Sequence, residues 1–338
     1  MDETVLQGRR TWRFEHAPRI VSTGTVVGPK EGGGPLGHSF DIVHGDLRLG
    51  QDSWEKAERV LLEEACDRAL RKRELTKEQV EFFIGGDLMN QIITSSFVAR
   101  TLSAPFISIY GACSTSMEGL ALAALLVDSR FARLVLTGTA SHNASAERVY
   151  RYPTEYGAQK PPTSQWTVTG AGAALVALNG DGPRITAATI GRVIDLGVKD
   201  PLNMGAAMAP AAFDTIEAHL RDLNIEPDYY DLIVTGDLGH VGSRILQDLW
   251  QKHSVRVADG QYRDCGVLIY GEDPSVFAGG SGAACSAVVT YGHLLSRLDE
   301  GRWRRILVVA TGALLSTVSY QQGESIPCVA HAVAIERS

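Results

Sequence analysis

PFISIYGACSTSMEGLALAALLV, residues 105–127, predicts a short strand, a tight corner and then a helix. The run Phe106–Tyr110 is rich in residues that favour β-structure, and Gly-Ala-Cys forms the corner. Beyond Met117 the helix has no polar face until Asp128. Because a helix that is apolar all round is buried all round, we expect this one at the centre of the fold, with the thiol of Cys113 at its mouth.

The position of Cys113 at the start of a helix predicts two local properties. The positive end of the helix dipole lowers the pKa of a thiol and favours a nearby anion. The hydroxyl groups of Ser114, Thr115 and Ser116 are suited to cap the first turn, where backbone N–H groups lack helical partners. Taken alone, a cysteine at such a corner is more often a buried structural thiol than a reactive one.

The composition indicates a soluble globular protein. The chain has 338 residues, of which 44% are hydrophobic and 21% charged, enough for one large double domain. Its net charge of −7 argues against a nucleic-acid surface. The five scattered cysteines lack the spacing of a zinc site and predict reduced intracellular thiols. The first residues are too polar for a signal peptide, and no run approaches the ~18 apolar residues of a membrane span.

Hydrophobic patterns place the other elements along the chain. We expect strands at 19–27, 80–87, 133–139, 170–178, 187–196, 231–237, 305–311 and 326–336. Helices are expected at 52–73, where Asp52 and Glu55 suggest a capping box, and at 211–223, 243–252 and in the second part of 279–297. The segment 90–102 is helical or a loop, and the polar stretch 141–167 predicts a long functional loop.

The second half of the chain repeats the order of the first. EFFIGGDLMN (81–90) resembles DLIVTGDLGH (231–240), and RLVLTGTASHNAS (133–145) resembles RILVVATGALLS (305–316). The Cys113 corner and its helix correspond to GSGAACSAVVTYGHLL (280–295). Such a repeat predicts two similar α/β halves, which we place at 1–180, carrying the Cys113 corner, and 181–338.

The repeat, the GACS corner and the strand GAGAALVAL (170–178) together resemble the thiolase and 3-oxoacyl-acyl-carrier-protein synthase superfamily. The resemblance implies a duplicated α/β fold layered α-β-α-β-α, and it covers residue 19 to the C-terminus. Three segments resemble, more closely, the stage V sporulation protein AD family of spore-forming bacteria. They are SIYGACSTSMEG, LIVTGDLGHVG and the run from 141 to 174.

That closer resemblance implies a dipicolinic acid binding protein of the SpoVA assembly, which moves dipicolinate into the developing spore. The ligand would arrive free or as its calcium chelate, and the protein would need no cofactor or metal of its own. The resemblance also implies a homodimer paired through an edge strand of the first half. The protein would be cytoplasmic in the developing spore system and peripherally associated with the spore inner membrane, beside other SpoVA proteins.

The superfamily's catalytic partners are missing from the matching positions. A condensing enzyme needs a thiolate together with His or Asn partners that move protons and stabilise a carbanion. Gly236 and Asp237 stand where a His is typical, and Gly280 stands where Asn is common. Ser316 lies in the segment where thiolases carry a second cysteine. We therefore interpret the protein as catalytically degenerate; an active acyl-transferase or condensing enzyme using Cys113, and an adaptor with a vestigial pocket, remain the alternatives.

A flat dicarboxylate needs an aromatic or apolar slot with hydrogen-bond donors at both ends. The N-termini of the two helices, at 113–116 and 280–283, would offer N–H groups to the carboxylates. Tyrosines would stack on the ring, and Arg151 or Lys160 would supply positive charge. The predicted ligand-binding residues are Cys113, Ser114, His142, Tyr150, Arg151, Tyr156, Lys160, Asp237, Ser281, Gly282 and Ser316, with no catalytic residue and no metal ligand.

Overall fold

The computed structural model describes residues 5–150 and 160–338. Its strands follow one path, β12-β11-β14-β15-β10-β3-β9-β7-β5-β6. On one side of the path lie β3 (Arg19–Val27), β5 (Phe82–Asp87), β6 (Phe106–Ser108), β7 (Leu134–Ser141) and β9 (Gly170–Ala177). On the other lie β10 (Arg184–Thr189), β11 (Leu232–Thr235), β12 (Tyr262–Asp264), β14 (Arg305–Ala313) and β15 (Cys328–Glu336).

The path has the same pattern read from either end. In the first half, β5 pairs in parallel with the short edge strand β6 on one side and with β7 on the other. In the second half, β11 pairs in the same way with the edge strand β12 and with β14. The strands that close the halves, β9 and β15, then run antiparallel to their neighbours. A single residue pair, Arg184 with Arg19, joins β10 to β3. The predicted duplicated α/β fold with two pseudo-symmetric halves is confirmed.

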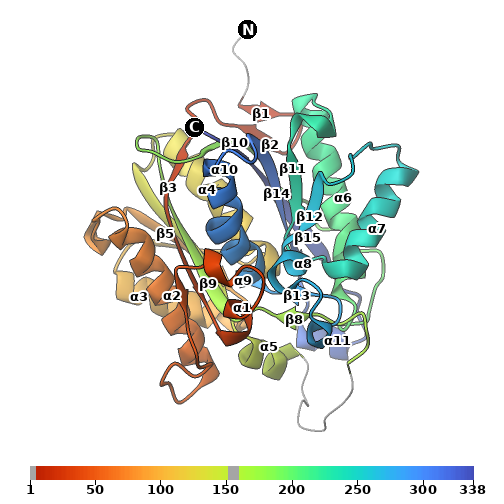
Figure 1. The fold of residues 1–338 in the computed structure, drawn as a ribbon, viewed down its shortest axis with the longest axis horizontal. Helices are drawn as coiled ribbons and strands as arrows, with labels where there is room; N and C mark the ends of the chain where they lie inside the picture. Colours follow the sequence, from red (N-terminus) through yellow and green to blue (C-terminus); the bar gives the residue numbers. More distant parts are fainter. Residues whose placement is uncertain (1–4, 151–159) are drawn as a thin grey trace.

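Helices form three layers around the two halves of the sheet (Figure 1). The outer helices are α2 (Trp54–Arg71) and α3 (Ile93–Leu102) on one side, and α6 (Met204–Leu223) and α7 (Gly239–Lys252) on the other. The middle layer holds α4 (Thr115–Asp128) and the run α9 (Ala283–Val288), a π-helical turn (Val289–Leu294) and α10 (Leu295–Asp299). Helix α4 contacts β7 and β9 as well as β14 and β15, which produces the α-β-α-β-α order.

Shorter elements connect these layers. They are β1 (Leu6–Gln7), β2 (Thr11–Arg13), α1 (Pro29–Gly32), β4 (Ile42–Val43), α5 (Asn143–Tyr150), β8 (Trp166–Thr167), α8 (Cys265–Tyr270), β13 (Gly280–Ser281) and α11 (Thr317–Gln321). Turns of 3-10 helix lie at Gly37–Ser39, Lys77–Gln79, Asn90–Ile92, Ala112–Ser114, Pro227–Tyr229 and Pro274–Val276. The described residues include no helix long and apolar enough to cross a bilayer.

Several predicted boundaries were wrong for identifiable reasons. Helix α6 begins at Met204 and continues through Pro210, because its flanking alanines are buried and packing outweighs one lost hydrogen bond. Ser53, instead of the expected Asp52, accepts a hydrogen bond from the Lys56 amide and caps α2. The segment 141–167 is not one loop, since β7 reaches Ser141 and α5 follows it.

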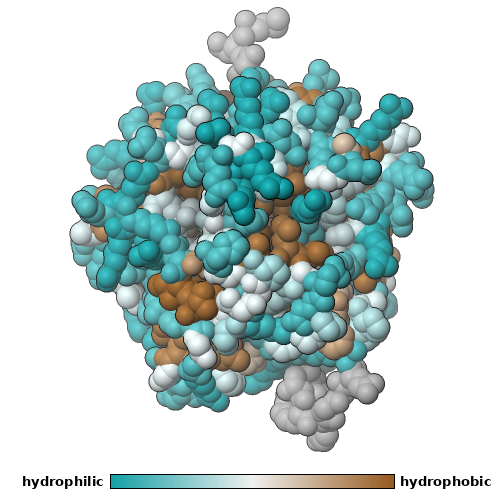
Figure 2. All heavy atoms as spheres, in the orientation of Figure 1, coloured by the Kyte–Doolittle hydropathy of each residue, from teal (hydrophilic) through white to brown (hydrophobic). Residues whose placement is uncertain are grey.

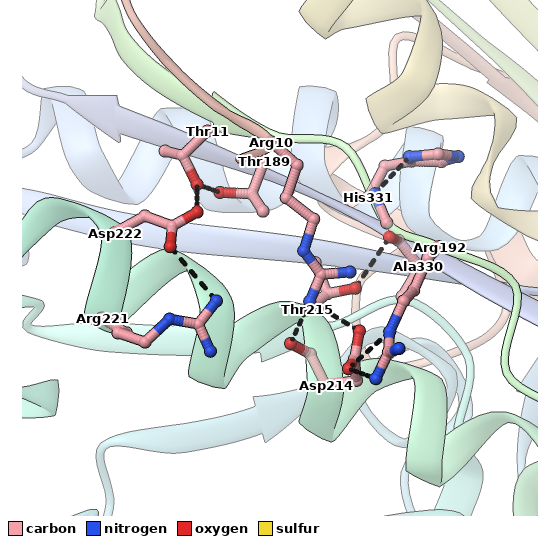
Figure 3. A network of polar contacts seen from close by, with 11 residues as sticks. Arg10, Thr11, Thr189, Arg192, Asp214, Thr215, Arg221, Asp222, Ala330 and His331 are labelled. Atoms are coloured by element: carbon pink, nitrogen blue, oxygen red, sulfur yellow. Dashed lines mark hydrogen bonds and ion pairs between the residues drawn. The ribbon is translucent and has the colours of Figure 1, made fainter. Parts of the chain in front are cut away.

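A polar network joins β2 and the residue before it to α6 (Figure 3). Thr11 of β2 hydrogen-bonds to Thr189 at 2.9 Å and to Asp222 at 3.0 Å. Arg10 and Arg192 both contact the carboxylate of Asp214, at 2.7 and 2.8 Å. Because β2 also pairs with β10, this network stabilises the strand at which the two halves meet.

Candidate functional site

The central corner is held by its own hydroxyl groups. Ala112 adopts the left-handed φ of 50°, which turns the chain sharply from β6 into α4. Ser114 and Thr115 donate hydrogen bonds of 2.7 Å back to the carbonyl oxygens of Gly111 and Ala112. These hydroxyls therefore lock the turn and do not cap the helix as predicted, because the carbonyls of the 3-10 turn lie nearer to them.

The corner presents Cys113 to a buried carboxylate from the other half. The thiol, 6% exposed, is in hydrogen-bonding contact with Asp237, which is 1% exposed and follows the end of β11. Asp237 accepts hydrogen bonds from the hydroxyl of Thr311 at 2.7 Å, the hydroxyl of Ser281 at 3.1 Å and the amide of Gly282 at 3.0 Å. Two halves of the chain thus build one polar centre.

The electrostatics of this centre are the reverse of those predicted from the helix dipole. Burial and then the neighbouring charge of Asp237 raise the pKa of Cys113 well above its ordinary value. Burial raises the pKa of Asp237 to about 6, although the hydrogen bond from Thr311 and its other donors oppose the rise. Near neutral pH the carboxyl group is therefore mostly ionised and the thiol is protonated, a state that suits a weak hydrogen-bond donor better than a nucleophile.

At the second helix N-terminus, two amides already donate to the protein's own side chains. The N–H of Gly282, at a φ of 104°, donates to Asp237, and the N–H of Ala284 donates to the hydroxyl of Ser141 at 3.2 Å. A Cβ on residue 282 would approach Ser141 closely, so glycine is required there by both conformation and space. These amides organise the protein's own polar groups instead of facing a ligand.

An inner cavity opens in front of Cys113. Its empty volume is about 400 Å³ including the opening, and most of that space is too narrow for a water molecule. Most of its wall is apolar or aromatic, with Cys113, Ser281 and Thr167 as polar points. It is lined by Leu88, Tyr110, Ala112, Cys113, Ala146, Tyr150, Thr167, Met204, Ser281, Ala313 and Leu315.

A larger outer cavity adjoins the inner one. Its empty volume is about 900 Å³, and much of that space is wide enough for water. The two cavities share Tyr110, Tyr150 and Leu315. The hydroxyl groups of the two tyrosines are 3.4 Å apart, and Tyr150 donates to the carbonyl of Leu88. The outer wall comprises Met89, Asn90, Gln91, Ile92, Ser108, Ile109, Tyr110, Tyr150, Leu314, Leu315, Ser316 and Thr317.

The predicted residues divide between these cavities and other places. Cys113, Tyr150 and Ser281 line the inner cavity, with Asp237 and Gly282 behind it, and Ser316 lines the outer one while capping α11. Three further predicted residues belong to neither lining: Ser114, His142 and Lys160.

His142 and Lys160 have structural partners instead. The buried ring of His142 contacts the Leu47 carbonyl at 2.9 Å and accepts from the Ala144 amide at 3.1 Å, so it fastens α5 to the loop before α2. Lys160 pairs with Glu147 at 2.8 Å. The predictions for Arg151 and Tyr156 lie outside the described residues.

Sequence reasoning missed Tyr110 and Thr311. Tyr110 immediately precedes the Gly-Ala-Cys corner, so its place in the central run was an available signal. Thr311 lies within the strand β14, and only the sheet register brings its hydroxyl to Asp237. Gln165, also missed, donates to the carbonyls of Asp237 at 2.7 Å and Gly280 at 2.9 Å and holds the two loops together.

The chain is similar to known sporulation proteins over almost its whole length. The model of the stage V sporulation protein AD family matches residues 8–336. A stage V sporulation protein AD from Bacillus subtilis is 53% identical over 333 residues, which cover 98% of each chain.

Solved structures of condensing enzymes share the fold. A 3-oxoacyl-acyl-carrier-protein synthase III from Aquifex aeolicus is 17% identical, with a TM-score of 0.60 over 95% of this chain and 100% of that one. A variant of OleA from Xanthomonas campestris is 15% identical, with a TM-score of 0.62 over 96% and 99%. At such identities the likeness concerns the fold and not the activity.

Proposed function

This chain belongs to the stage V sporulation protein AD family, and on that premise we propose that it acts in sporulation by binding dipicolinic acid (pyridine-2,6-dicarboxylate) rather than by catalysis. The observation that carries the proposal is the centre formed by Cys113 and Asp237 in front of an aromatic-walled cavity. A cavity lies in front of the thiol, but a carboxylate that suppresses thiolate formation stands beside it.

The two adjoining cavities supply the parts that a flat aromatic acid requires. Tyr110 and Tyr150 line both cavities with aromatic rings, and the hydroxyls of Ser316 and Thr317 offer donors in the outer one. The inner cavity is too narrow for a pyridine ring with two carboxyl groups. The ligand therefore occupies the outer cavity, or the tyrosine pair moves to admit it further.

The charge of the lining favours a ligand with little net charge. None of the described residues that line either cavity is Lys or Arg, and Asp237 is negative nearby. Burying a free dianion in such surroundings is costly. A one-to-one chelate of calcium with dipicolinate has no net charge, which supports the chelate as the form that binds.

Isothermal titration calorimetry of the purified protein tests this proposal, with dipicolinate, dipicolinate plus equimolar calcium, and benzoate as the single-carboxylate control. We expect dipicolinate to bind more tightly than benzoate, and calcium to tighten it further. Tyr110→Ala removes a ring wall and should weaken binding about two- to tenfold, the usual worth of one stacked ring. Tyr320→Ala, at a tyrosine of similar exposure (48% against 44%) outside both cavities, is the matched control. Equal affinities for dipicolinate and benzoate would contradict the proposal.

The competing function is acyl transfer or condensation through Cys113. Incubation with acyl-coenzyme A followed by mass spectrometry of the Cys113 peptide separates the two. Our proposal expects no stable adduct and no turnover, because burial and the charge of Asp237 keep the thiol protonated. An adaptor with a vestigial cavity would instead retain its partner assembly and its sporulation phenotype after Cys113 or Ser316 is replaced by a bulky residue.

We further propose that the protein works as a homodimer paired through β6, beside other SpoVA proteins at the spore inner membrane. Support comes from the edge position of β6 and from the exposed Tyr110, which follows it in the chain. Sedimentation velocity of the protein, compared with a variant carrying Lys at Ile107, tests the pairing. A monomer at micromolar concentration in the unmodified protein would refute it.

A further inference from the structure

The second half of the sheet ends in an open strand edge. β12 pairs only with β11, in parallel, through Tyr262, Arg263 and Asp264. Within the described residues no strand lies on its outer side. The carbonyl of Tyr262 instead accepts a hydrogen bond of 2.7 Å from the guanidinium of the adjacent Arg263. A side chain thus occupies a backbone acceptor that a neighbouring strand could use.

A groove with an empty volume of about 1220 Å³ runs beside this edge. Trp250 and Tyr262 form its aromatic floor in edge-to-face contact, 5.0 Å between ring centroids. Val255 and Val257, in the irregular segment after α7, also line it. The indole N–H of Trp250, which is 4% exposed, has no acceptor among the described residues. A buried donor without an acceptor is costly, and a bound backbone carbonyl would remove that cost.

The groove is more basic than the protein as a whole. Arg256 and Arg263 are exposed and line it, and neither pairs with a carboxylate in the part of the chain that the structure describes. Asp259 is the one acidic residue among the described lining residues. Two unpaired guanidinium groups on a chain of net charge −7 favour an acidic occupant.

We propose that the β12 edge and this groove, lined by Trp250, Val255, Arg256, Val257, Tyr262 and Arg263, bind an extended acidic segment of a partner protein. The segment adds a strand outside β12, its backbone takes the place of the Arg263 side chain at the Tyr262 carbonyl, and its carboxylates contact Arg256 and Arg263. One of its carbonyls accepts from the indole N–H of Trp250. The edge lies apart from the lining of the Cys113 cavities, so a partner held there leaves them open.

The test uses the full chain and a labelled peptide of alternating charge, acetyl-Glu-Val-Glu-Val-Glu-amide, followed by fluorescence anisotropy. The charge-reversed Lys-Val-Lys-Val-Lys peptide probes charge, and a version N-methylated at alternate residues probes the backbone pairing. We expect weak binding of the acidic peptide and loss of binding for both controls. The double variant R256E/R263E should reduce its affinity roughly three- to tenfold or more, as expected for two exposed ion pairs.

R9E/R100E makes the same change of charge at two exposed arginines outside the groove and should leave the affinity unchanged. In ¹H–¹⁵N spectra the indole signal of Trp250, identified by its absence from W250F, should shift on titration with the acidic peptide. Equal binding of the Lys peptide, undiminished binding of the N-methylated peptide, or an unchanged R256E/R263E affinity would each overturn the proposal.

Discussion

Replacing Asp237 with Asn should make Cys113 reactive. The substitution keeps the shape of the side chain and one oxygen, which can still accept from Ser281 and Gly282. Its NH2 group takes the place of the oxygen that accepts from Thr311, whose hydroxyl can turn to accept instead, and the negative charge in contact with the thiol is removed. Because that charge is one of the two main causes of the raised thiol pKa, the pKa should fall. Burial remains, so the thiol should still ionise less readily than an exposed cysteine.

The size of the change follows from Coulomb's law. Two unit charges about 4 Å apart interact by about 4 kcal/mol at an effective dielectric constant of about 20, which corresponds to roughly three pKa units. A lower pKa also makes a thiolate a weaker nucleophile, so each unit gains only about threefold in rate at fixed pH. We therefore expect alkylation of Cys113 to accelerate by about ten- to fortyfold.

Alkylation of the folded protein by iodoacetamide at pH 8, followed by intact and peptide mass spectrometry, measures this rate. The variant Cys113→Ser identifies the modified site. Asp299→Asn, at another carboxyl group whose pKa is raised by burial but which lines neither cavity, is the matched control and should leave the rate unchanged. Thermal melting shows whether the variants remain folded. An unchanged or slower rate for Asp237→Asn would refute the assignment of Asp237 as the group that suppresses the thiolate.

Other predictions concern packing and pH. Gly312→Ala should destabilise the protein by about 1–3 kcal/mol in urea unfolding, because the added Cβ would collide with the Gly111 carbonyl. Gly45→Ala, where the added Cβ would meet no atom, is the control. Equal losses of stability in the two variants would contradict the packing argument. Ser316→Trp should weaken dipicolinate binding in calorimetry, since Ser316 lines the outer cavity, and an unchanged affinity would contradict that placement of the ligand. Burial and then the charge of Asp87 raise the pKa of Glu58 to about 8, so its contribution to stability is complete below its unfolded pKa of about 4.3 and is lost as the pH rises through about 8. Glu58→Gln should flatten that loss in unfolding measured from pH 4 to 9, and a parallel pH profile would contradict the assignment.

Much of the architecture was predictable because its signals are local. The strand at Arg19–Val27 has the predicted bounds, since a continuous run of β-favouring residues ends in Gly28 and Pro29. The central helix was predictable from its apolar circumference, and α4 is indeed buried over most of its surface. Boundaries failed where tertiary packing outweighed a local rule, as at Pro210 inside α6.

The candidate site divides in the same way. The sequence by itself determined that Cys113 stands at a strand-to-helix corner, that Asp237 stands where a histidine is typical, and that the two belong to repeated halves. The direction of the thiol's pKa was decided only by tertiary structure, because burial and the charge of Asp237 exceed the effect of one helix dipole. The side on which His142 lies was decided in the same way. A histidine after a strand can face a cavity or the protein's own backbone, and here the Leu47 carbonyl lies within hydrogen-bonding distance of its ring.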